Sequence, residues 1–590
     1  RLVDVQLGVH VTASGDGHAL EGSNLTGIPL AVSVDAGCRL AILNCSFYDC
    51  PVAIDGDPRA EVDLSTEVVS EIVNSSCAWS GRYTVASTGE LNITGSTVTL
   101  SGENATSSGI DAVLGSTLRI SLSTIRGEGD DSFSIVANGT LTVRSSSFIG
   151  GGEAGGPASL ASNGAAASLV NSTFRGCGLA LSLGGTDPTV RDCVFTGNAR
   201  SVLLVGVQRL QLIGCSFRGS GSVPMAMSIQ SPLGSNSVLV VRNVTVRNYT
   251  VWGLQDEHYG NVQMTGCVLD NANASLGRRA GDAATLSDVL VKGCKLEIGS
   301  SGFTVTDCVF VDATLSLQGN SGGSLVSRCS FTGAMGPSSA SLEVDSSIRI
   351  TLEDLNLTGV GVGLRFSGGS EISVNDLQIV GASGTGLEVN GSIVRMEACH
   401  LADLEGTGVR VWASGSRVEF RNGTMSGSGD RTGYDVDASG GGDAWVLNTT
   451  FNRSSVLSSG AGRVEVLWHV TVEPVLPWGG ALWDPDFLVV EDARGIEVVN
   501  TSTAGAVVRL YQFSEVDGDR TSLTPHAFTV SDMVEGVRYS GEHTIDGSIH
   551  LVLDLVDVAP PAARAGPDQV VDEDQKLTLD ATGSSDNDPS

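Results

Sequence analysis

Apolar and small residues recur in one fixed register at eighteen places along this chain. Each place carries a bulky apolar residue, with a small or apolar residue two positions before it. At sixteen places a glycine, asparagine or aspartate follows two positions later. Side chains two positions apart share a face of a β-strand, so the pattern predicts strands with one apolar face, each followed by a bend that tolerates positive φ. The bulky residues are Phe47, Trp79, Leu100, Ile125, Phe148, Phe174, Phe195, Phe217, Val246, Leu269, Leu296, Phe310, Phe331, Leu357, Ile379, Leu401, Met425 and Phe451.

The spacing of these strands predicts a solenoid. Successive bulky residues lie mostly 21 to 29 positions apart, which is the length of one coil in proteins that stack one coil per repeat. A single coil cannot bury its apolar face, whereas stacked coils bury a continuous core. The Leu-x-x-Leu-x-Leu pattern of leucine-rich repeats is missing, so we expect a parallel β-helix. The 14 positions between Leu296 and Phe310 are too few for a coil, so one of these two residues is out of register.

Composition supports a turn-rich, all-β chain. Seventy-six glycines and only 17% charged residues suit many tight turns, and no amphipathic stretch exceeds two helical turns. We expect the β-helix over residues 1–470, followed by a capping seam over 471–485 and a small β-sandwich module over 486–558. The seam is predicted where the repeat stops and Pro474, Pro477, Trp478, Trp483 and Pro485 follow.

Two parts of the chain resemble known families. The stretch Pro560-Pro-Ala-Ala-Arg-Ala-Gly-Pro-Asp-Gln569, followed by Leu577-Thr-Leu-Asp580 and Gly583-Ser-Ser-Asp586, is similar to the opening of a PKD-type domain. The later Trp-Asp-Phe-Gly-Asp segment of such domains is missing, which implies a linker and a truncated immunoglobulin-like module over 559–590. The repeat register resembles the right-handed parallel β-helix proteins of archaeal and bacterial surfaces and of polysaccharide lyases.

Net charge restricts the partners that we expect. The chain has 66 acidic and 34 basic residues, which gives −32 at pH 7. An acidic surface repels polyanions, so we predict no binding to nucleic acid, and the sequence has no apolar run of 18 residues that would predict a membrane span. We predict no cofactor other than calcium, which acidic turns and the pair Asp572 and Asp574 would bind weakly.

The asparagines indicate a compartment. Sixteen of 24 asparagines lie in Asn-x-Ser/Thr sequons, and five of these fall three positions before a bulky residue, on the predicted outward strand face: Asn44, Asn171, Asn243, Asn422 and Asn448. Asparagine and threonine are also common in turns and outward ladders, which is the alternative explanation. We predict N-glycosylation of a secreted or cell-surface protein. The sixteen are Asn24, Asn44, Asn74, Asn92, Asn104, Asn138, Asn171, Asn243, Asn248, Asn273, Asn356, Asn390, Asn422, Asn448, Asn452 and Asn500.

Twelve cysteines in an extracellular chain would normally imply disulfides. Nine of them instead occupy the small position of the register, where other coils place Ser, Val or Leu, so we expect a mostly reduced interior column of thiols. Cys38, Cys50 and Cys177 fall outside the register and are the better disulfide candidates. The nine are Cys45, Cys77, Cys193, Cys215, Cys267, Cys294, Cys308, Cys329 and Cys399.

The sequence contains no recognisable catalytic constellation. Polysaccharide-active β-helices need clustered carboxylates together with Arg or Lys. The densest polar sets are Asp130-Asp131, Asp256-Glu257-His258-Tyr259 and Asp430-Arg431, and each is predicted to be a solvated turn. His400 is expected on the outward face as a surface residue. We assign no catalytic residue.

These observations favour a non-catalytic, glycosylated structural or adhesive protein that binds surface glycans or neighbouring surface proteins. The alternative is a polysaccharide lyase or glycoside hydrolase that uses a groove on the β-helix. A groove lined by three or more convergent carboxylates would distinguish the enzyme from the structural protein.

Overall fold

The computed structural model describes most of residues 2–558. The ranges outside the description are 4–6, 13–17, 36–37, 57–60, 103, 129–131, 154–155, 165, 186, 220–224, 230–237, 257–260, 277–282, 300–301, 320–322, 334–335, 337, 346–348, 427–432, 483, 504, 506 and 559–590. The chain divides into two compact units, Arg1–Ile372 and Ser373–Ser590. The described residues contain strands and turns but no helix, as the composition predicts.

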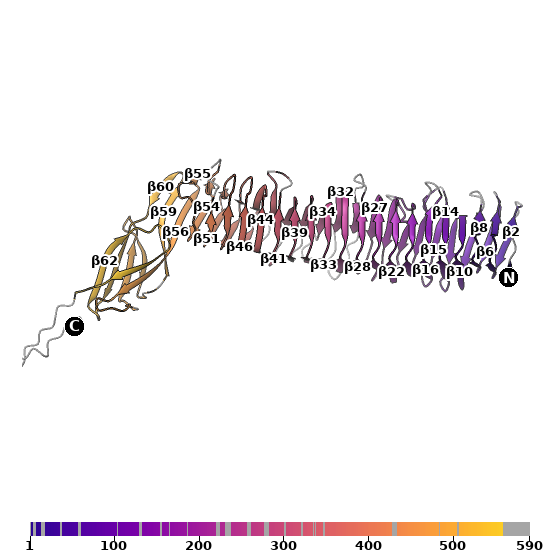
Figure 1. The fold of residues 1–590 in the computed structure, drawn as a ribbon, viewed down its shortest axis with the longest axis horizontal. Coiled ribbons are helices and arrows are strands. Elements are labelled where there is room, and N and C mark those ends of the chain that lie inside the picture. Colours follow the sequence, from indigo (N-terminus) through magenta and orange to yellow (C-terminus); the bar gives the residue numbers. More distant parts are fainter. Residues whose placement is uncertain are drawn as a thin grey trace, which may run out of the picture. The chain divides into compact units, whose positions relative to one another are not determined.

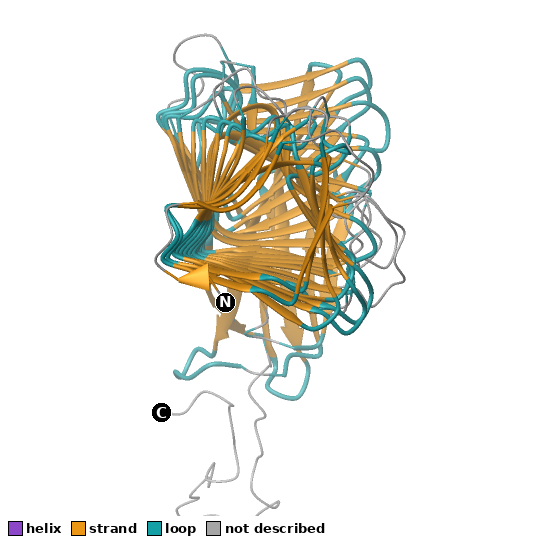
Figure 2. Ribbon diagram, turned by 90° about the vertical axis from the view of Figure 1, so that its right-hand side faces the viewer, coloured by secondary structure: helices purple, strands orange, loops and turns teal. Residues whose placement is uncertain are grey.

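The first unit is a parallel β-helix in which each coil contributes one strand to each of three sheets (Figures 1 and 2). The first sheet contains β1 (Leu2–Val3), β4 (Asn24–Thr26), β7 (Ser46–Tyr48), β10 (Val69–Val73), β13 (Glu90–Thr94), β16 (Thr117–Ser121), β19 (Thr140–Arg144), β22 (Ala166–Val170), β25 (Thr189–Arg191), β28 (Arg209–Ile213), β31 (Val238–Arg242), β33 (Asn261–Thr265), β35 (Ala283–Ser287), β38 (Gly302–Thr306), β41 (Ser324–Ser327) and the start of β44 (Ile350–Thr358).

The second sheet contains β2 (Leu7–Val11), β5 (Leu30–Val34), β8 (Val52–Gly56), β11 (Ser76–Ser80), β14 (Thr97–Ser101), β17 (Thr124–Gly127), β20 (Ser147–Ile149), β23 (Thr173–Arg175), β26 (Val194–Thr196), β29 (Ser216–Arg218), β32 (Thr245–Asp256), β34 (Val268–Leu276), β36 (Leu290–Lys292), β39 (Val309–Val311), β42 (Ser330–Thr332) and the end of β44.

The third sheet contains β3 (His18–Glu21), β6 (Arg39–Leu43), β9 (Glu61–Thr66), β12 (Arg82–Val85), β15 (Gly109–Ala112), β18 (Ser134–Ala137), β21 (Leu160–Ser162), β24 (Leu179–Leu183), β27 (Arg200–Leu204), β30 (Met225–Ile229), the ends of β32 and β34, β37 (Lys295–Ile298), β40 (Thr314–Gln318), β43 (Ala340–Asp345) and β45 (Val362–Ser367).

The interior of the first unit is built from equivalent residues stacked coil on coil. In the second sheet the rings of Phe148, Phe174, Phe195 and Phe217 follow one another with centroids 4.7 to 4.9 Å apart and interplanar angles of 3° to 8°. Phe310 and Phe331 stack in the same way at 4.5 Å. Each ring is buried and in register with the next. The predicted stacking of these coils is therefore confirmed.

Several bulky residues of the predicted register lie elsewhere. Phe47 belongs to the first sheet, where it pairs with Ile72, and Leu296 belongs to the third sheet, where it pairs with Leu315. The second-sheet residue of that coil is Val291, which pairs with Phe310 and removes the short gap. Trp79 and Leu100 lie in the second sheet but two residues too far along it. The residues in register with Ile125 are Cys77 and Val98. The errors arose because all three sheets alternate apolar and polar residues in the same way.

A column of small residues runs between the first and second sheets. Ser75, Ser96, Ser123, Ser146 and Ser172 occupy it in consecutive coils, and each backbone N–H donates to the hydroxyl of the next serine over 3.1 to 3.3 Å. Each hydroxyl also donates to the carbonyl two residues before it. Serine therefore satisfies a backbone N–H that would otherwise be buried without a partner.

Cysteines continue this column on both sides of the serines. The backbone N–H of Cys50 donates to Ser75, so Cys50 belongs to the column and was wrongly predicted to lie outside it. Cys45, Cys77 and Cys294 lie elsewhere, with Cys77 inside β11. All twelve cysteines are buried free thiols, including the three disulfide candidates Cys38, Cys50 and Cys177.

Burial also accounts for the chemistry of these thiols. It raises the pKa of Cys177 to about 11 and that of Cys399 to about 12, so the reactive thiolate is scarce at neutral pH. Cys193 and Cys215 are predicted neighbours in consecutive coils. Contact with Cys215 and burial raise the pKa of Cys193. The thiols behave as small apolar side chains.

The second unit begins with coils that also contain three strands each. Its first sheet contains β48 (Ile393–Glu397), β51 (Arg417–Arg421), β54 (Asp443–Leu447) and β56 (Arg463–Val475). Its second sheet contains the end of β46 (Glu371–Val380), β49 (His400–Ala402) and β52 (Thr424–Met425). Its third sheet contains β47 (Leu387–Asn390), β50 (Val409–Trp412), β53 (Val436–Ser439) and β55 (Val456–Ser459).

The last coil strand, β56, is covered by strands that follow it in the chain. It pairs antiparallel with β59 (Val507–Val516) and parallel with β63 (Ile549–Asp554), and β59 continues into β60 (Asp519–Ser522). The open edge of the sheet is thereby paired with backbone. Because β56 runs through Val475, it extends across the predicted domain boundary at 470 into the predicted seam.

The remaining strands form a separate five-stranded antiparallel sheet. Their order is β58 (Glu497–Thr501), β57 (Phe487–Glu491), β61 (His526–Asp532), β62 (Val537–His543) and β64 (Val556–Asp557). Residues 486–558 thus contribute both to the solenoid sheet and to a sheet of their own. The segment that resembles a PKD-type domain, with Asp572 and Asp574, lies outside the described residues.

The stacked interior predicts unequal costs for two neighbouring substitutions. Phe217→Ala should lower the free energy of unfolding by about 3 to 5 kcal/mol, because it opens a cavity beside Phe195. Cys215→Ser should cost about 1 kcal/mol or less, because a hydroxyl at this position can accept and donate as Ser96 and Ser172 do. Urea unfolding followed by circular dichroism measures both. Equal losses would contradict the column.

Candidate functional site: polar columns on the solenoid surface

Outward residues of the solenoid also form columns. Strands in register place equivalent side chains ~4.8 Å apart along each sheet. Two like charges at that distance repel each other, whereas opposite charges stabilise the pair. Each outward side chain therefore interacts mainly with the equivalent side chains of the preceding and the following coil.

The clearest column of this kind lies on the third sheet. Glu297, Ser316, Glu343 and Arg365 are paired in register through β37, β40, β43 and β45. The Lys295 Nζ lies 3.0 Å from Glu297 Oε1 and 3.9 Å from Glu343 Oε2. The Arg365 guanidinium lies 3.1 Å from the other oxygen of Glu343. We call Lys295, Glu297, Glu343 and Arg365 the charged stripe.

The charges of this stripe cancel. Its four side chains are 21% to 36% exposed and carry two positive and two negative charges. Two carboxylates that flank a glycosidic bond must leave room for sugar and water, but here Lys295 contacts both. The stripe therefore holds neighbouring coils together.

The second unit contains a similar arrangement. Arg410 stands in register between Glu388 and Asp437. Its Nε lies 3.2 Å from Asp437 and one terminal nitrogen lies 4.0 Å from Glu388. Opposite charges one coil apart on the third sheet are thus found in both units.

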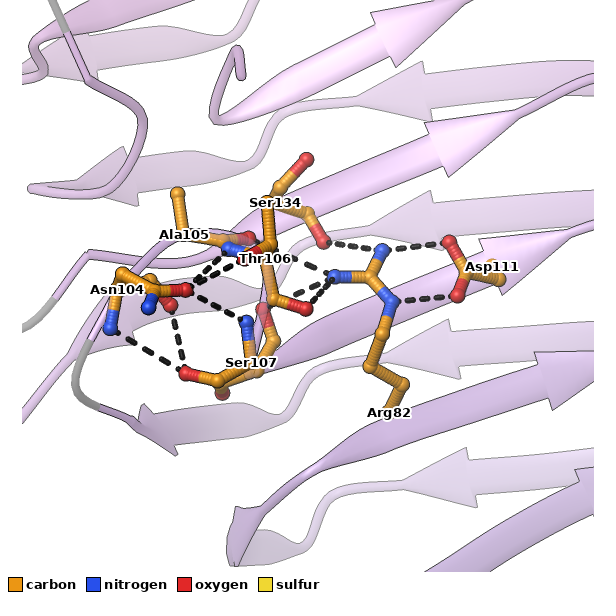
Figure 3. Close-up of polar contacts among 8 residues, drawn as sticks. Arg82, Asn104, Ala105, Thr106, Ser107, Asp111 and Ser134 are labelled. Carbon is orange, nitrogen blue, oxygen red and sulfur yellow. Dashed lines mark hydrogen bonds and ion pairs between the residues drawn. The ribbon is translucent and has the colours of Figure 1, made fainter. Parts of the chain in front are cut away.

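A second polar cluster fixes a surface loop beside the third sheet (Figure 3). The Arg82 guanidinium binds both carboxylate oxygens of Asp111 in the next coil and donates to the carbonyl of Ser134 two coils away, over 3.3 Å. It also donates to the carbonyl of Thr106 over 3.3 Å. The backbone N–H of Ala105 donates to Glu153 over 3.1 Å. Since the donors of Arg82 are engaged within the protein, this cluster holds the loop rather than a ligand.

The corner between the first and second sheets carries a third column. Its residues have φ between 48° and 64° in the first unit, where glycine, asparagine and aspartate are the residues with least strain. We call it the left-handed column. It contains Asp49, Asn74, Gly95, Leu122, Ser145, Asn171, Asp192, Gly214, Asn243, Gly266, Asp288, Asp307, Arg328 and Asp354, and in the second unit Asp376, Ala398, Asn422 and Asn448.

Five predicted glycosylation sites belong to this column: Asn74, Asn171, Asn243, Asn422 and Asn448. The prediction that Asn171, Asn243, Asn422 and Asn448 lie on an outward strand face is wrong, because each occupies a corner. Asn44 lies at the corner before β7, also with a positive φ of 51°. None of the sixteen sequon asparagines is buried. Their modification stays a prediction.

The polar sets singled out in the sequence do not form a site among the described residues. His400 is exposed in β49, and its Nδ1 lies 2.9 Å from Thr424 Oγ1. The side chain of Asp256 and residues 257–259 lie outside the description, as do Asp130, Asp131, Asp430 and Arg431. Among the described residues, no group of three or more His, Cys, Asp or Glu side chains could hold a metal ion, and no helix is long and apolar enough to cross a membrane.

Sequence reasoning missed the charged stripe and the Arg82 cluster. Glu297 and Glu343 are 46 positions apart, and the coil that contains Glu297 was out of register. Arg82 and Asp111 are 29 positions apart, in coils of unequal length. The sequence signal that could have revealed them is a pair of oppositely charged residues separated by about one coil length. Coils of unequal length obscure that signal.

One buried histidine lies in the antiparallel sheet of the second unit. His526 is fully buried in β61, and neither ring nitrogen has a hydrogen-bond partner in the described structure. Burial lowers the pKa of His526, and the nearby Asp492 carboxylate partly opposes that shift. His543 stands opposite it on β62 and is bonded to the Tyr539 hydroxyl. Burial without a hydrogen-bond partner therefore favours the neutral form of His526.

Residues 296–451 match a protein family described as a right handed beta helix region. The match covers roughly a quarter of the chain and includes the last coils of the first unit and coils of the second. Together with the stacked sheets, it shows a right-handed parallel β-helix of about 18 coils. No curated protein matches the chain.

The charged stripe predicts a salt-sensitive loss on removal of one carboxylate. Glu343→Gln leaves Lys295 and Arg365 without their shared partner and should lower the free energy of unfolding by about 1 kcal/mol. The difference from the parent protein should shrink as sodium chloride rises from about 0.1 to 1 M, because salt screens exposed charges. Urea unfolding at both concentrations measures it. The exposed Glu128 provides a control, and an equal, salt-dependent loss in Glu128→Gln would contradict the stripe.

His526 predicts a loss of stability on acidification. Its pKa is lower in the folded than in the unfolded state, so its contribution is complete above the unfolded value of about 6.5 and is lost as pH falls through the range below. The loss should approach 1.4 kcal/mol per pH unit at most. Calorimetry from pH 7.5 to 5.5, roughly the range in which histidine titrates, should show a smaller slope in His526→Leu than in the parent. An equal slope in His526→Leu and in the parent would contradict this interpretation of His526.

Proposed function

We propose that this protein is a non-catalytic structural or adhesive protein of a cell surface or secreted layer. Right-handed β-helices occur in polysaccharide lyases, glycoside hydrolases and surface proteins, so the fold alone does not decide between them. The observation that carries the proposal is the charged stripe, whose carboxylates are bound by Lys295 and Arg365 and thus stabilise the stack. A catalytic pair would instead face a substrate.

Two further features support a surface location. None of the sixteen sequon asparagines is buried, and glycans on those that are modified would protect an extended sheet surface from proteases and from pairing with other chains. The acidic chain, at −32, would stay soluble and could recruit divalent cations along its turns. The partners that we propose are surface glycans or neighbouring surface proteins, with calcium as a weak ligand.

The third sheet is the proposed recognition face. The left-handed column lies at the corner between the first and second sheets, where its side chains are bonded along the stack. The charged stripe lies on a different sheet, where polar residues follow one another at a ~4.8 Å repeat from Ser316 through Glu343 to Arg365, which suits an extended polar chain. Recognition there would use rearranged ion pairs at low energetic cost, since exposed pairs contribute little to stability.

A turnover and binding assay tests this proposal. The purified full chain should bind one or more members of a panel of uronate and neutral polysaccharides immobilised on a sensor surface, with and without calcium. It should release neither new reducing ends nor unsaturated uronates from them. Glu343→Lys should weaken binding to an anionic polysaccharide if sheet stacking alone matters, or strengthen it if the stripe contacts the ligand directly.

Product formation would replace the structural proposal by the enzymatic one. Product loss in both Glu297→Gln and Glu343→Gln would then place the chemistry at the stripe, whereas unchanged turnover would place it elsewhere. Absence of binding to every polysaccharide would leave a neighbouring protein as the partner, which cross-linking on intact cells would identify.

A further inference from the structure

The sixteen sequons fall into different structural classes, and two of these classes hold the carboxamide in opposite ways. In the first class the side-chain nitrogen is used inside the left-handed column. The Nδ2 of Asn74 donates to Asp49 over 3.0 Å, and that of Asn171 donates to Ser145 over 3.2 Å. The Nδ2 of Asn448 donates to Asn422. Each bond runs along the stack to the preceding coil.

Packing further restricts Asn74. A Cβ on Gly95, which follows Asn74 in the column, would lie 2.4 Å from the Asn74 Oδ1. The Asn74 carboxamide is thus held between two coils: its nitrogen is bonded to Asp49 in the preceding coil, and its oxygen packs against Gly95 in the next. Transfer replaces only one of the two Nδ2 hydrogens, but the amide must turn out of the column to reach a glycan donor, and that rotation breaks the bond to the preceding coil.

In the second class the carboxamide is held through its oxygen by its own sequon. The Asn104 Oδ1 accepts from the Thr106 hydroxyl over 2.6 Å and from the backbone N–H groups of Thr106 and Ser107 (Figure 3). The Asn452 Oδ1 accepts from the Ser454 hydroxyl over 2.7 Å and from its backbone N–H. The Asn356 Oδ1 accepts from the Thr358 hydroxyl over 3.3 Å. All three asparagines are exposed.

This second arrangement suits the chemistry of glycan transfer. Transfer forms a bond between Nδ2 and the first carbon of the sugar, breaks the bond from that carbon to the phosphate of a lipid-linked donor, and releases one Nδ2 proton. A hydroxyl that donates to Oδ1 polarises the carboxamide, which makes the Nδ2 protons more acidic, and it leaves both Nδ2–H groups outside that bond. The Arg82 cluster also fixes the Asn104 turn through the carbonyl of Thr106.

We propose that in the folded protein Asn104, Asn356 and Asn452 are the acceptors for N-glycans, whereas Asn74, Asn171 and Asn448 are structural residues of the left-handed column. This inference rests on the proposed surface location for its biological meaning, but it concerns the folded chain itself. It also divides a uniform set of sequons into modification sites and corner residues.

The test is glycan transfer to the purified, unglycosylated full chain after folding. The chain is incubated with an oligosaccharyltransferase preparation and a lipid-linked oligosaccharide, and occupancy at each of the six sequons is measured by peptide mass spectrometry. Short synthetic peptides centred on the same sequons give the occupancy without the fold. The ratio of protein to peptide occupancy should be about tenfold higher at Asn104, Asn356 and Asn452 than at the other three.

A matched variant tests the cause. Ser145→Gly removes the acceptor of the Asn171 Nδ2 and keeps the corner conformation, because other coils carry glycine at this position with φ of 62° to 64°. Transfer to Asn171 should then rise toward its peptide level, while Asn74 and Asn448 stay low. Equal ratios at the six sites, or no rise at Asn171 in S145G, would overturn the proposal.

The proposed surface location fails on a different result. If the protein isolated from its source carried no glycan at any sequon, the surface assignment would be in doubt. The acceptor pattern measured in vitro would still hold, because it depends only on the folded chain.

Discussion

Parallel stacking in register is the constraint on which the rest of the structure depends. Each side chain has as its nearest neighbours the equivalent residues one coil before and after, at ~4.8 Å. Inside the stack this distance suits flat rings, and the phenylalanines from Phe148 to Phe217 lie almost parallel. Outside the stack the same distance makes like charges costly, so Arg365 follows Glu343 and Arg410 stands between two acids.

The corners of the coil follow from the same constraint. A chain that turns sharply between two sheets needs a residue with positive φ at the same point of each coil, and glycine, asparagine or aspartate meets that need with least strain. The exceptions show how strain is tolerated. Arg328 has a φ of 51° and forms an ion pair with the Asp307 carboxylate of the preceding coil at 2.7 Å, which lowers the pKa of Asp307. Nothing in the structure explains Leu122 at the same position.

The parts of the fold that could be predicted are those where a coil repeats its own chemistry. The stacked phenylalanines were recognisable because an aromatic residue, a small residue and a glycine or acidic bend residue recur together over coils of similar length. Phe47 and Leu296 were misplaced because apolar alternation is common to all three sheets and gives no sign of which sheet a strand joins. Unequal coil lengths also hid the contacts of Lys295 and Arg82, since opposite charges 48 or 29 positions apart are not recognisable neighbours in a sequence.

The sequons show how a fold can imitate a modification signal. The corner of this coil calls for asparagine, the next position is the buried small column, and the position after that opens a strand whose outward face favours threonine. Asn171-Ser172-Thr173 and Asn243-Val244-Thr245 therefore satisfy the rules of the coil and the rules of a sequon at once. The coil itself therefore generates sequons, and their number alone does not measure glycosylation. Under the proposal made above, the bonding of each carboxamide would distinguish structural from modified sites, because a corner asparagine such as Asn171 uses its nitrogen along the stack and a turn asparagine such as Asn104 uses its oxygen.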